Sequence, residues 1–206
     1  KHISEETHQS VIQNLGSGQQ MEEIGFESVG PTIGKELKDK TTVFVTLSLL
    51  AIAVYIIIAF SNVTYPIKSW NYGFASLFIL ANDILIPLGV FSVLGYLYGV
   101  QLTIPVVTAL LTVVGYAINN VVVVYDRLRE NLLRSNARKE NFEELANSAI
   151  TQTLARQINT SLTVLFALAF IFFWGGETLK YFALALILGV ATGLYSSIFL
   201  AIPILV

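Results

Sequence analysis

The chain has 206 residues, of which 54% are hydrophobic and only 13% charged, and its mean hydropathy is +0.68. A soluble domain carries roughly a quarter charged residues. This chain therefore has too few charges to cover a water-exposed surface, and we expect it to lie in a membrane. The net charge of −2 gives no basis for nucleic-acid binding, and the absence of cysteine excludes disulfides and thiolate metal sites.

Long intervals without charged residues predict five membrane-spanning helices, because one span needs about 20 mostly apolar residues. The first interval lies between Lys40 and Lys68. A longer one, between Asp83 and Asp126, is interrupted by glycine and proline and holds two helices. The predicted spans cover residues 41–60, 72–97, 103–125, 157–176 and 181–206. The predicted fold is an all-α membrane bundle over residues 41–206.

Two segments outside the spans are predicted to face water. Residues 1–40 hold four lysines and seven acidic residues. They combine a short helical pattern with a strand-like stretch and a turn at Gly30 and Pro31, so we interpret them as the C-terminal remnant of a truncated extracytoplasmic α+β domain. Residues 126–157 form a loop with six of the 12 basic residues, which favours a cytoplasmic loop and an external N-terminal piece. Lysines beside the first predicted span favour the opposite orientation in the membrane.

The loop also contains a helical pattern. Asn141 and Glu144 have the spacing of a capping box. Apolar residues between Phe142 and Leu154 then recur at helical intervals. This pattern indicates either an amphipathic helix lying on the cytoplasmic face of the membrane or a solvated helix that leads into the next span.

Asp83 is a charged residue about ten positions into its predicted span. A carboxylate at the centre of a membrane helix costs roughly 2.5 to 3.5 kcal/mol on insertion scales, so its presence there requires a structural or functional explanation. One interpretation is a protonatable group facing the bundle interior, because a low dielectric favours the neutral acid. The other is a neutral acid that ties two helices together by hydrogen bonds. Pro87, four residues later, cannot donate to the carbonyl of Asp83.

Further polar residues lie in or beside the spans. Asn119 and Asn120, next to Tyr116, cannot titrate, and hydrogen bonds between helices are their expected role, each worth about 0.6 to 2 kcal/mol. Arg156 stands at the start of the fourth span. Its side chain either reaches the lipid headgroups or points inward to a carboxylate, on Asp83 or on another subunit.

The last predicted span carries a stripe of small residues at every fourth position, which allows two helix backbones to approach closely. The stripe, predicted to pack against another helix, consists of Ala185, Gly189, Gly193, Ser197 and Ala201. No enzyme signature accompanies it. His2 and His8 lie near the N-terminus, and the sequence has no phosphate-binding glycine loop and no nucleophile with a neighbouring base. We therefore expect no catalytic site and no metal site.

Three strings make the sequence similar to a known family. Residues 28–35 read SVGPTIGK, residues 115–131 read GYAINNVVVVYDRLREN, and residues 175–201 read GGETLKYFALALILGVATGLYSSIFLA. Together, in this order and spacing, they resemble the SecF family, the smaller membrane subunits of the SecD/SecF pair. The resemblance runs from about Ser28 to the C-terminus. Since the family has six spans, it implies that the chain holds spans two to six and lacks the first span and most of the outer domain.

The resemblance implies a function in protein export. The family belongs to the resistance-nodulation-division superfamily, which uses proton flow through a membrane bundle to move an outer domain. The implied partners are SecD, the SecYEG channel, a preprotein substrate and membrane lipids, with no nucleic acid. The implied location is the bacterial inner membrane. No cofactor is implied other than protons as the coupling ion.

The resemblance also assigns roles to single residues. Asp83 matches the acid of an HDV-type motif, with Asn82 in place of the usual His. Arg156 matches the family's basic residue before the fifth span, and Asn119 matches its asparagine. The cytoplasmic DRxRE motif corresponds to Asp126, Arg127, Arg129 and Glu130.

One departure from the family pattern concerns proton transfer. The pattern reads Ile-Asn-Asp-Thr where this chain has Ile118, Asn119, Asn120 and Val121. An asparagine resembles a protonated aspartate in shape and cannot release a proton. Either SecD supplies the acid, Asp83 has taken over its role, or this form is uncoupled. The alternatives to a proton-coupled export subunit are a lipid or small-molecule exporter of the same superfamily and a structural subunit without coupling.

Overall fold

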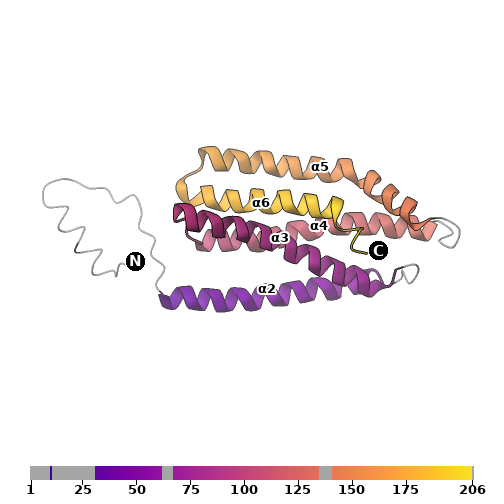
Figure 1. Cartoon of the computed structure of the whole chain (residues 1–206), viewed down its shortest axis with the longest axis horizontal. Coiled ribbons are helices and arrows are strands. Elements are labelled where there is room, and N and C mark those ends of the chain that lie inside the picture. Colours follow the sequence, from indigo (N-terminus) through magenta and orange to yellow (C-terminus); the bar gives the residue numbers. More distant parts are fainter. Residues whose placement is uncertain (1–9, 11–30, 62–66, 135–140, 206) are drawn as a thin grey trace. The chain divides into compact units, whose positions relative to one another are not determined.

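The computed structural model describes residues 10, 31–61, 67–134 and 141–205, and these ranges contain five long helices and no β-strand. Figure 1 shows the helices α4, α5 and α6 running beside one another, with α3 crossing them. The helices are α2 Pro31–Ala59, α3 Ser69–Tyr98, α4 Ile104–Arg134, α5 Phe142–Trp174 and α6 Glu177–Phe199. The all-α membrane bundle predicted from the sequence is confirmed.

Helices α3 to α6 are each long and apolar enough to cross a membrane, judged by length and composition. Helix α2 carries a shorter apolar stretch, Thr46–Ala59. It begins at Pro31, where a turn was predicted, because proline suits the first turn of a helix, whose N–H groups have no partner within the helix. Apart from Ser10, residues 1–30 lie outside the described residues, and with them the predicted α+β piece.

The chain divides into two units, Lys1–Leu47 and Ser48–Val206. The described part of the first unit is the helical segment from residue 31 onward, together with Ser10. The second unit contains the rest of α2 and the helices α3 to α6, and it holds all the candidate functional residues of the spans.

The helix predicted within the loop is continuous with the following span. Helix α5 runs unbroken from Phe142 to Trp174, so the interpretation as a separate helix lying flat on the membrane is wrong. Asn141 is its N-cap, and its side-chain oxygen accepts a hydrogen bond from the backbone N–H of Glu143 at 3.4 Å. Ala146 and Ala149, in the first two turns, are buried in the same apolar cluster as residues of α3 and α4. This packing holds the loop-side end of α5 against the bundle.

Helices α4 and α6 lie parallel and very close together. A Cβ added at Gly189 would overlap the side chain of Val113, and one added at Gly193 would lie 3.2 Å from the Cβ of Ala117. About two turns further along both helices, the hydroxyl of Tyr125 donates to the backbone oxygen of Ala201 at 3.0 Å. All members of the small-residue stripe are buried, and the close approach requires them to be small: Ala185, Gly189, Gly193, Ser197 and Ala201.

The core of the bundle is apolar at both ends. The larger cluster, at the end where α4 meets α5, includes Phe60 and Tyr72, whose stacked rings lie 5.0 Å apart, and the ring of Tyr125 at 5.2 Å from that of Tyr72. A smaller cluster at the other end contains Phe91, Val106, Ala109 and Ala185. Between them lies a group of buried polar side chains.

Candidate functional site

The candidate site is a layer of polar side chains in the middle of the bundle, to which α3, α4, α5 and α6 each contribute. Every member is 2% exposed or less. We call it the polar layer and define it as Asp83, Asn120, Gln157, Ser196 and Ser197. Asp83 is the one charged side chain among the buried residues that the structure describes.

Asp83 lies near the midpoint of α3 and is fully buried. Its Oδ1 accepts a hydrogen bond from the hydroxyl of Ser196, on α6. The amide of Asn82 in turn donates to Ser196 Oγ at 3.3 Å. The carboxyl group is therefore tied to another helix, as in the helix-linking interpretation, and it also faces the bundle interior, as the protonatable interpretation requires.

Two polar atoms of the layer have no hydrogen-bond partner among the described residues: Asp83 Oδ2 and Asn120 Nδ2. Gly193 lies beside the first of them, since a Cβ at Gly193 would be 3.8 Å from Asp83 Oδ2. Buried polar groups in proteins are nearly always hydrogen-bonded. Because the interior has a low dielectric, a change of protonation or of helix position at these unpaired groups has a large energetic consequence.

The layer extends along α5 through a second set of hydrogen bonds. The hydroxyl of Ser197 donates to Gln157 Oε1, and Gln157 Nε2 donates to Thr153 Oγ1 at 3.1 Å. One turn in the other direction, Tyr116 OH donates to Ser161 Oγ at 3.3 Å. Thr153, Gln157 and Ser161 are four residues apart, so they share one buried face of α5.

The remaining predicted site residues lie apart from the layer. Asn119 is exposed although its neighbour Asn120 is buried, because adjacent residues on a helix point in different directions. Arg156 is also exposed and forms no ion pair with any residue that the structure describes. Pairing of Arg156 with Asp83 within this chain is therefore wrong, since Asp83 is fully buried and bonded to Ser196.

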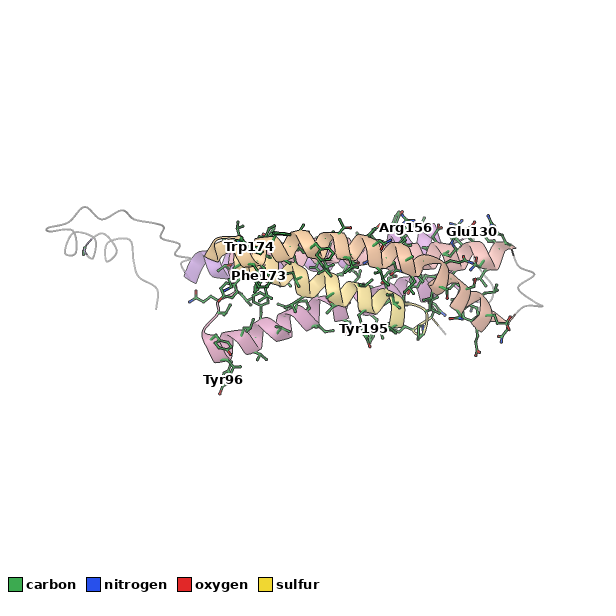
Figure 2. The ribbon with its side chains drawn as sticks, turned by 90° about the horizontal axis from the view of Figure 1, so that it is seen from above. Tyr96, Glu130, Arg156, Phe173, Trp174 and Tyr195 are labelled. Atoms are coloured by element: carbon green, nitrogen blue, oxygen red, sulfur yellow. The ribbon has the colours of Figure 1, made fainter. Side chains whose placement is uncertain are left out.

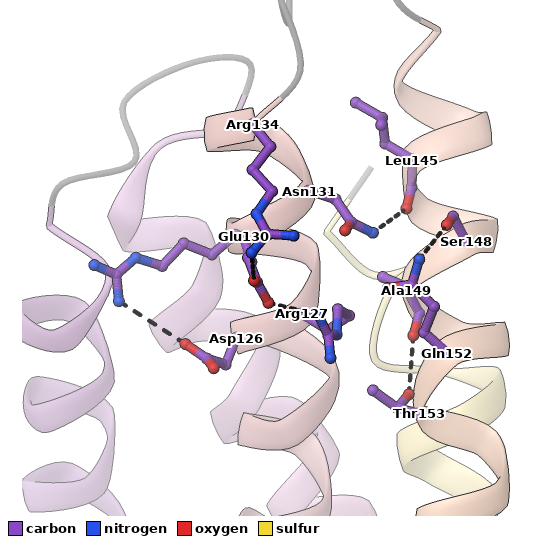
Figure 3. A network of polar contacts seen from close by, with 11 residues as sticks. Asp126, Arg127, Glu130, Asn131, Arg134, Leu145, Ser148, Ala149, Gln152 and Thr153 are labelled. Carbon is purple, nitrogen blue, oxygen red and sulfur yellow. Dashed lines mark hydrogen bonds and ion pairs between the residues drawn. The ribbon is translucent and has the colours of Figure 1, made fainter.

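The DRxRE residues form two separate sets of ion pairs at the last turns of α4, where the helix leaves the apolar region (Figure 3). Glu130 accepts from Arg127 at 2.6 Å and pairs with Arg134 at 2.7 Å. Arg129 lies 3.9 Å from Asp126 and 6.0 Å from the ring centroid of Phe60. These pairs are partly exposed, so their contribution to stability is small.

The opposite end of the bundle is aromatic. Figure 2 shows Tyr96, Phe173 and Trp174 toward one end and Glu130 toward the other. Tyr96 and Trp174 are 90% and 77% exposed. Exposed aromatic rings of this kind are typical of the interface between lipid and water.

Sequence reasoning missed the partners of Asp83. Ser196 was not singled out, and Ser197 was assigned to helix packing alone. Gln157 was given no role. The signal that could have found this set is the four-residue spacing of Thr153, Gln157 and Ser161, which places them on one face of a helix.

These features define a class: a multi-pass helical membrane protein with a buried carboxyl group in a polar layer at the centre of its bundle. Among the described residues, no group of histidine, cysteine, aspartate and glutamate side chains is arranged to hold a metal ion. The chain belongs to the SecD/SecF family, since the family model "Protein export membrane protein SecD/SecF, C-terminal" matches residues 8–206. The resemblance found from the three strings is thus confirmed.

Curated relatives agree with the family assignment. The chain is 43% identical over 185 residues to the protein translocase subunit SecF of Thermobaculum terrenum, and this match covers 90% of the chain and 57% of the relative. It is 41% identical to SecF of Anaerolinea thermophila, over 99% of the chain and 66% of the relative. With SecDF of Thermus thermophilus the identity is 39%, over 89% of the chain and 23% of the relative. The chain therefore spans about three fifths of the length of the SecF relatives.

Solved structures show the same fold. The crystal structure of SecDF from Thermus thermophilus, described as a translocon-associated membrane protein, matches with a TM-score of 0.83 and 35% identity. The match covers 98% of this chain and 26% of that one. A SecDF structure in the super-membrane-facing form matches over the same shares of the two chains with a TM-score of 0.69 and 32% identity.

Proposed function

We propose that this chain is the membrane part of an auxiliary subunit of the Sec preprotein translocase, which works with SecD and the SecYEG channel and uses the proton gradient to assist export. The observation that carries the proposal is the burial of Asp83 at the centre of the bundle with its hydrogen bond to Ser196 on α6. An ionisable side chain within a membrane bundle is by default a functional group.

The position of Asp83 supports coupling between protonation and helix movement. Its bond to Ser196 joins α3 to α6, and α6 packs against α3, α4 and α5. Protonation removes a charge from a fully buried site and changes what Oδ1 and Oδ2 can accept or donate. Each elementary charge that crosses the membrane is worth about 2.3 kcal/mol per 100 mV, which is enough to shift the populations of two helix arrangements.

Exposed polar residues in the spans support a partner bundle, which we propose to be SecD. Asn119 and Arg156 are exposed although both lie in helices that are long and apolar enough to cross a membrane. Exposure of such groups to hydrocarbon is costly, so a second helical bundle covers them at lower free energy than acyl chains do. The relative from Thermus thermophilus is named SecDF, a single name that combines SecD and SecF. Lipids cover the remaining apolar surface.

We place the α4–α5 loop in the cytoplasm and the N-terminal residues outside the inner membrane. The support is that Arg127, Arg129 and Arg134 lie in the last turns of α4, which lead into this loop. Basic residues concentrate on the cytoplasmic side of membrane proteins.

The experiment that tests the proposal is export of a preprotein into proteoliposomes that contain SecYEG and the subunit assembled with SecD. We expect stimulation by the subunit to require a proton gradient, because the gradient is the source of free energy. Addition of a protonophore should reduce the stimulation to the level of vesicles without the subunit. Stimulation that persists after the gradient is collapsed would contradict proton coupling.

A structural subunit without proton coupling is the second candidate, and Asn120 favours it. Asn120 is 2% exposed, and its side chain cannot release a proton. If the asparagine weakens coupling, Asn120→Asp should increase the dependence of export on the gradient, since it adds a second titratable group to the polar layer. The same vesicle assay measures this change. An unaltered gradient dependence would mean that the coupling acid lies elsewhere.

A further inference from the structure

Arg129, in the last turns of α4, is not neutralised as its neighbours on that helix are. Arg127 and Arg134 share Glu130, at 2.6 and 2.7 Å. For Arg129, the carboxylate oxygen of Asp126 lies 3.9 Å from Nη1, which is too far for a hydrogen bond. Its Nε is buried without a hydrogen-bond partner among the described residues. The guanidinium is therefore available to an acceptor from outside the chain, and its planar fork suits a phosphate group.

Lys68 is a second cation in the same region, since it and Arg129 both adjoin Phe60. The residue after Lys68 is Ser69, whose hydroxyl donates to the carbonyl oxygen of Phe60 at 2.9 Å. The guanidinium carbon of Arg129 lies 6.0 Å from the centre of the Phe60 ring. Lys68 is exposed and forms no ion pair with any residue that the structure describes. The first turn of α3 contains no acidic residue that could neutralise these two charges.

An exposed aromatic stripe begins beside Lys68 and continues along α3. Trp70, Phe74 and Phe78 follow one another at every fourth position, and they are 62%, 64% and 61% exposed. The rings of Trp70 and Phe74 are stacked, with their centroids 6.3 Å apart. This spacing puts the three rings on one face of the helix, over roughly 12 Å of its length. Because α3 is long and apolar enough to cross a membrane, the stripe leads from the cations into the apolar region.

The cations and the stripe together fit one kind of ligand. A free phosphate ion would bind the cations and leave the rings uncovered. An anionic phospholipid has a phosphate group for the cations and an acyl chain for the rings. Tryptophan is typical of the level at which lipid headgroups lie. Basic side chains at that level attract anionic lipids, and each contributes about 5-fold in affinity.

We propose that Lys68 and Arg129 bind the phosphate of an anionic phospholipid, whose acyl chain lies along Trp70, Phe74 and Phe78. We call this the lipid site. The lipid belongs to the leaflet at the α4–α5 end, where α3 begins and α4 ends (Figure 1). Its phosphate joins the starts and ends of two helices that the chain itself links there only through Phe60. The lipid site is independent of proton coupling, because neither Asp83 nor the gradient takes part in it.

Trp70 allows lipid at the site to be detected by fluorescence. The subunit assembled with SecD is reconstituted in mixtures of phosphatidylcholine and phosphatidylglycerol, in which one lipid carries brominated acyl chains that quench tryptophan on contact. Trp70 is one of two tryptophans in the chain, and the quenching that is missing in Trp70→Phe belongs to it. We expect phosphatidylglycerol to be preferred about 5- to 30-fold over phosphatidylcholine, because two cations contribute. High salt should reduce this preference.

Charge-removing variants identify the cations that bind the lipid. Lys68→Gln and Arg129→Gln should each lower the preference for phosphatidylglycerol about 5-fold. Lys68 is exposed, so its variant keeps the test available if Arg129→Gln fails to assemble with SecD. The matched control is Arg127→Gln, because Arg127 is bound to Glu130 and lies two positions from Arg129, on the opposite side of α4. It should keep the parental preference.

The outcomes distinguish the lipid site from its alternatives. Equal quenching by the two brominated lipids in the parental protein would overturn it, and so would a preference that survives in both Lys68→Gln and Arg129→Gln. An equal loss in Arg127→Gln would show a general effect of surface charge instead. If inorganic phosphate at constant ionic strength abolishes the preference, the cations bind free phosphate and the lipid assignment is wrong. A loss in Lys68→Gln or Arg129→Gln, without a loss in Arg127→Gln or with phosphate, supports the lipid site.

Discussion

Replacing Asp83 with asparagine should abolish the gradient-dependent part of preprotein export while leaving assembly with SecD intact. Asparagine has nearly the shape of the neutral acid, and its side-chain oxygen can still accept the hydrogen bond from Ser196. It cannot bind and release a proton, so the charge that the gradient acts upon is lost. We expect export stimulation in SecYEG proteoliposomes to fall to the level measured with a collapsed gradient.

The matched control is Glu144→Gln, which also replaces a carboxylate with an amide. Glu144 is exposed in the first turn of α5, so its charge is screened by water and its replacement should leave gradient-dependent stimulation unchanged. Co-purification with SecD shows that both variants assemble. Full stimulation by an assembled Asp83→Asn subunit would show that coupling does not require Asp83. The proton-binding group would then belong to a partner chain.

The largest loss of stability is expected from Gly189→Ala. The added Cβ would overlap the side chain of Val113, which faces it across the contact between α4 and α6. Because these helices are held at close distance along their length, the clash cannot be relieved by a single side chain. Overpacking of this kind costs about 1 to 3 kcal/mol. The unfolding midpoint of the protein in detergent should therefore fall.

Two comparisons identify the cause of that loss. Gly89→Ala, in α3, places a Cβ where no atom lies within 4 Å, so it should leave the midpoint unchanged or raise it slightly. The double variant with Val113→Ala removes the overlapping atoms and should recover most of the stability, giving a clear coupling energy between the two sites. A Gly189→Ala protein that unfolds at the parental temperature would show that the contact between α4 and α6 is loose.

The sequence predicted where the helices lie along the chain better than how they connect and pack against one another. The predicted spans 157–176 and 181–206 leave a short connection between them, and in the structure Gly175 caps the end of α5 and Gly176 the start of α6. The loop helix was recognised too, but the sequence did not decide between a helix on the membrane face and a helix that leads into the next span, as α5 does. Arg156 breaks the apolar pattern there, and a charged residue near a helix end is compatible with either arrangement.

Only some residues of the candidate site could be predicted from the sequence. Asp83 was found because a charge in an apolar helix is conspicuous. Ser196 was not, since serine is common in membrane helices and carries no pattern of its own. The difference between Asn119, which is exposed, and Asn120, which is buried, depends on how α4 is rotated about its axis.

The sequence by itself determined that this protein is a helical membrane bundle of the SecD/SecF family with an acid inside one span. It could do so because hydropathy is a property of each segment, and a membrane helix satisfies its backbone hydrogen bonds within that segment. Only the tertiary structure decided that Asp83 meets Ser196, that Ser197 meets Gln157, and that Arg156 faces outward. Lipid and the bundle core are equally apolar, so the order of apolar residues does not determine helix rotation and register; close packing between the helices does.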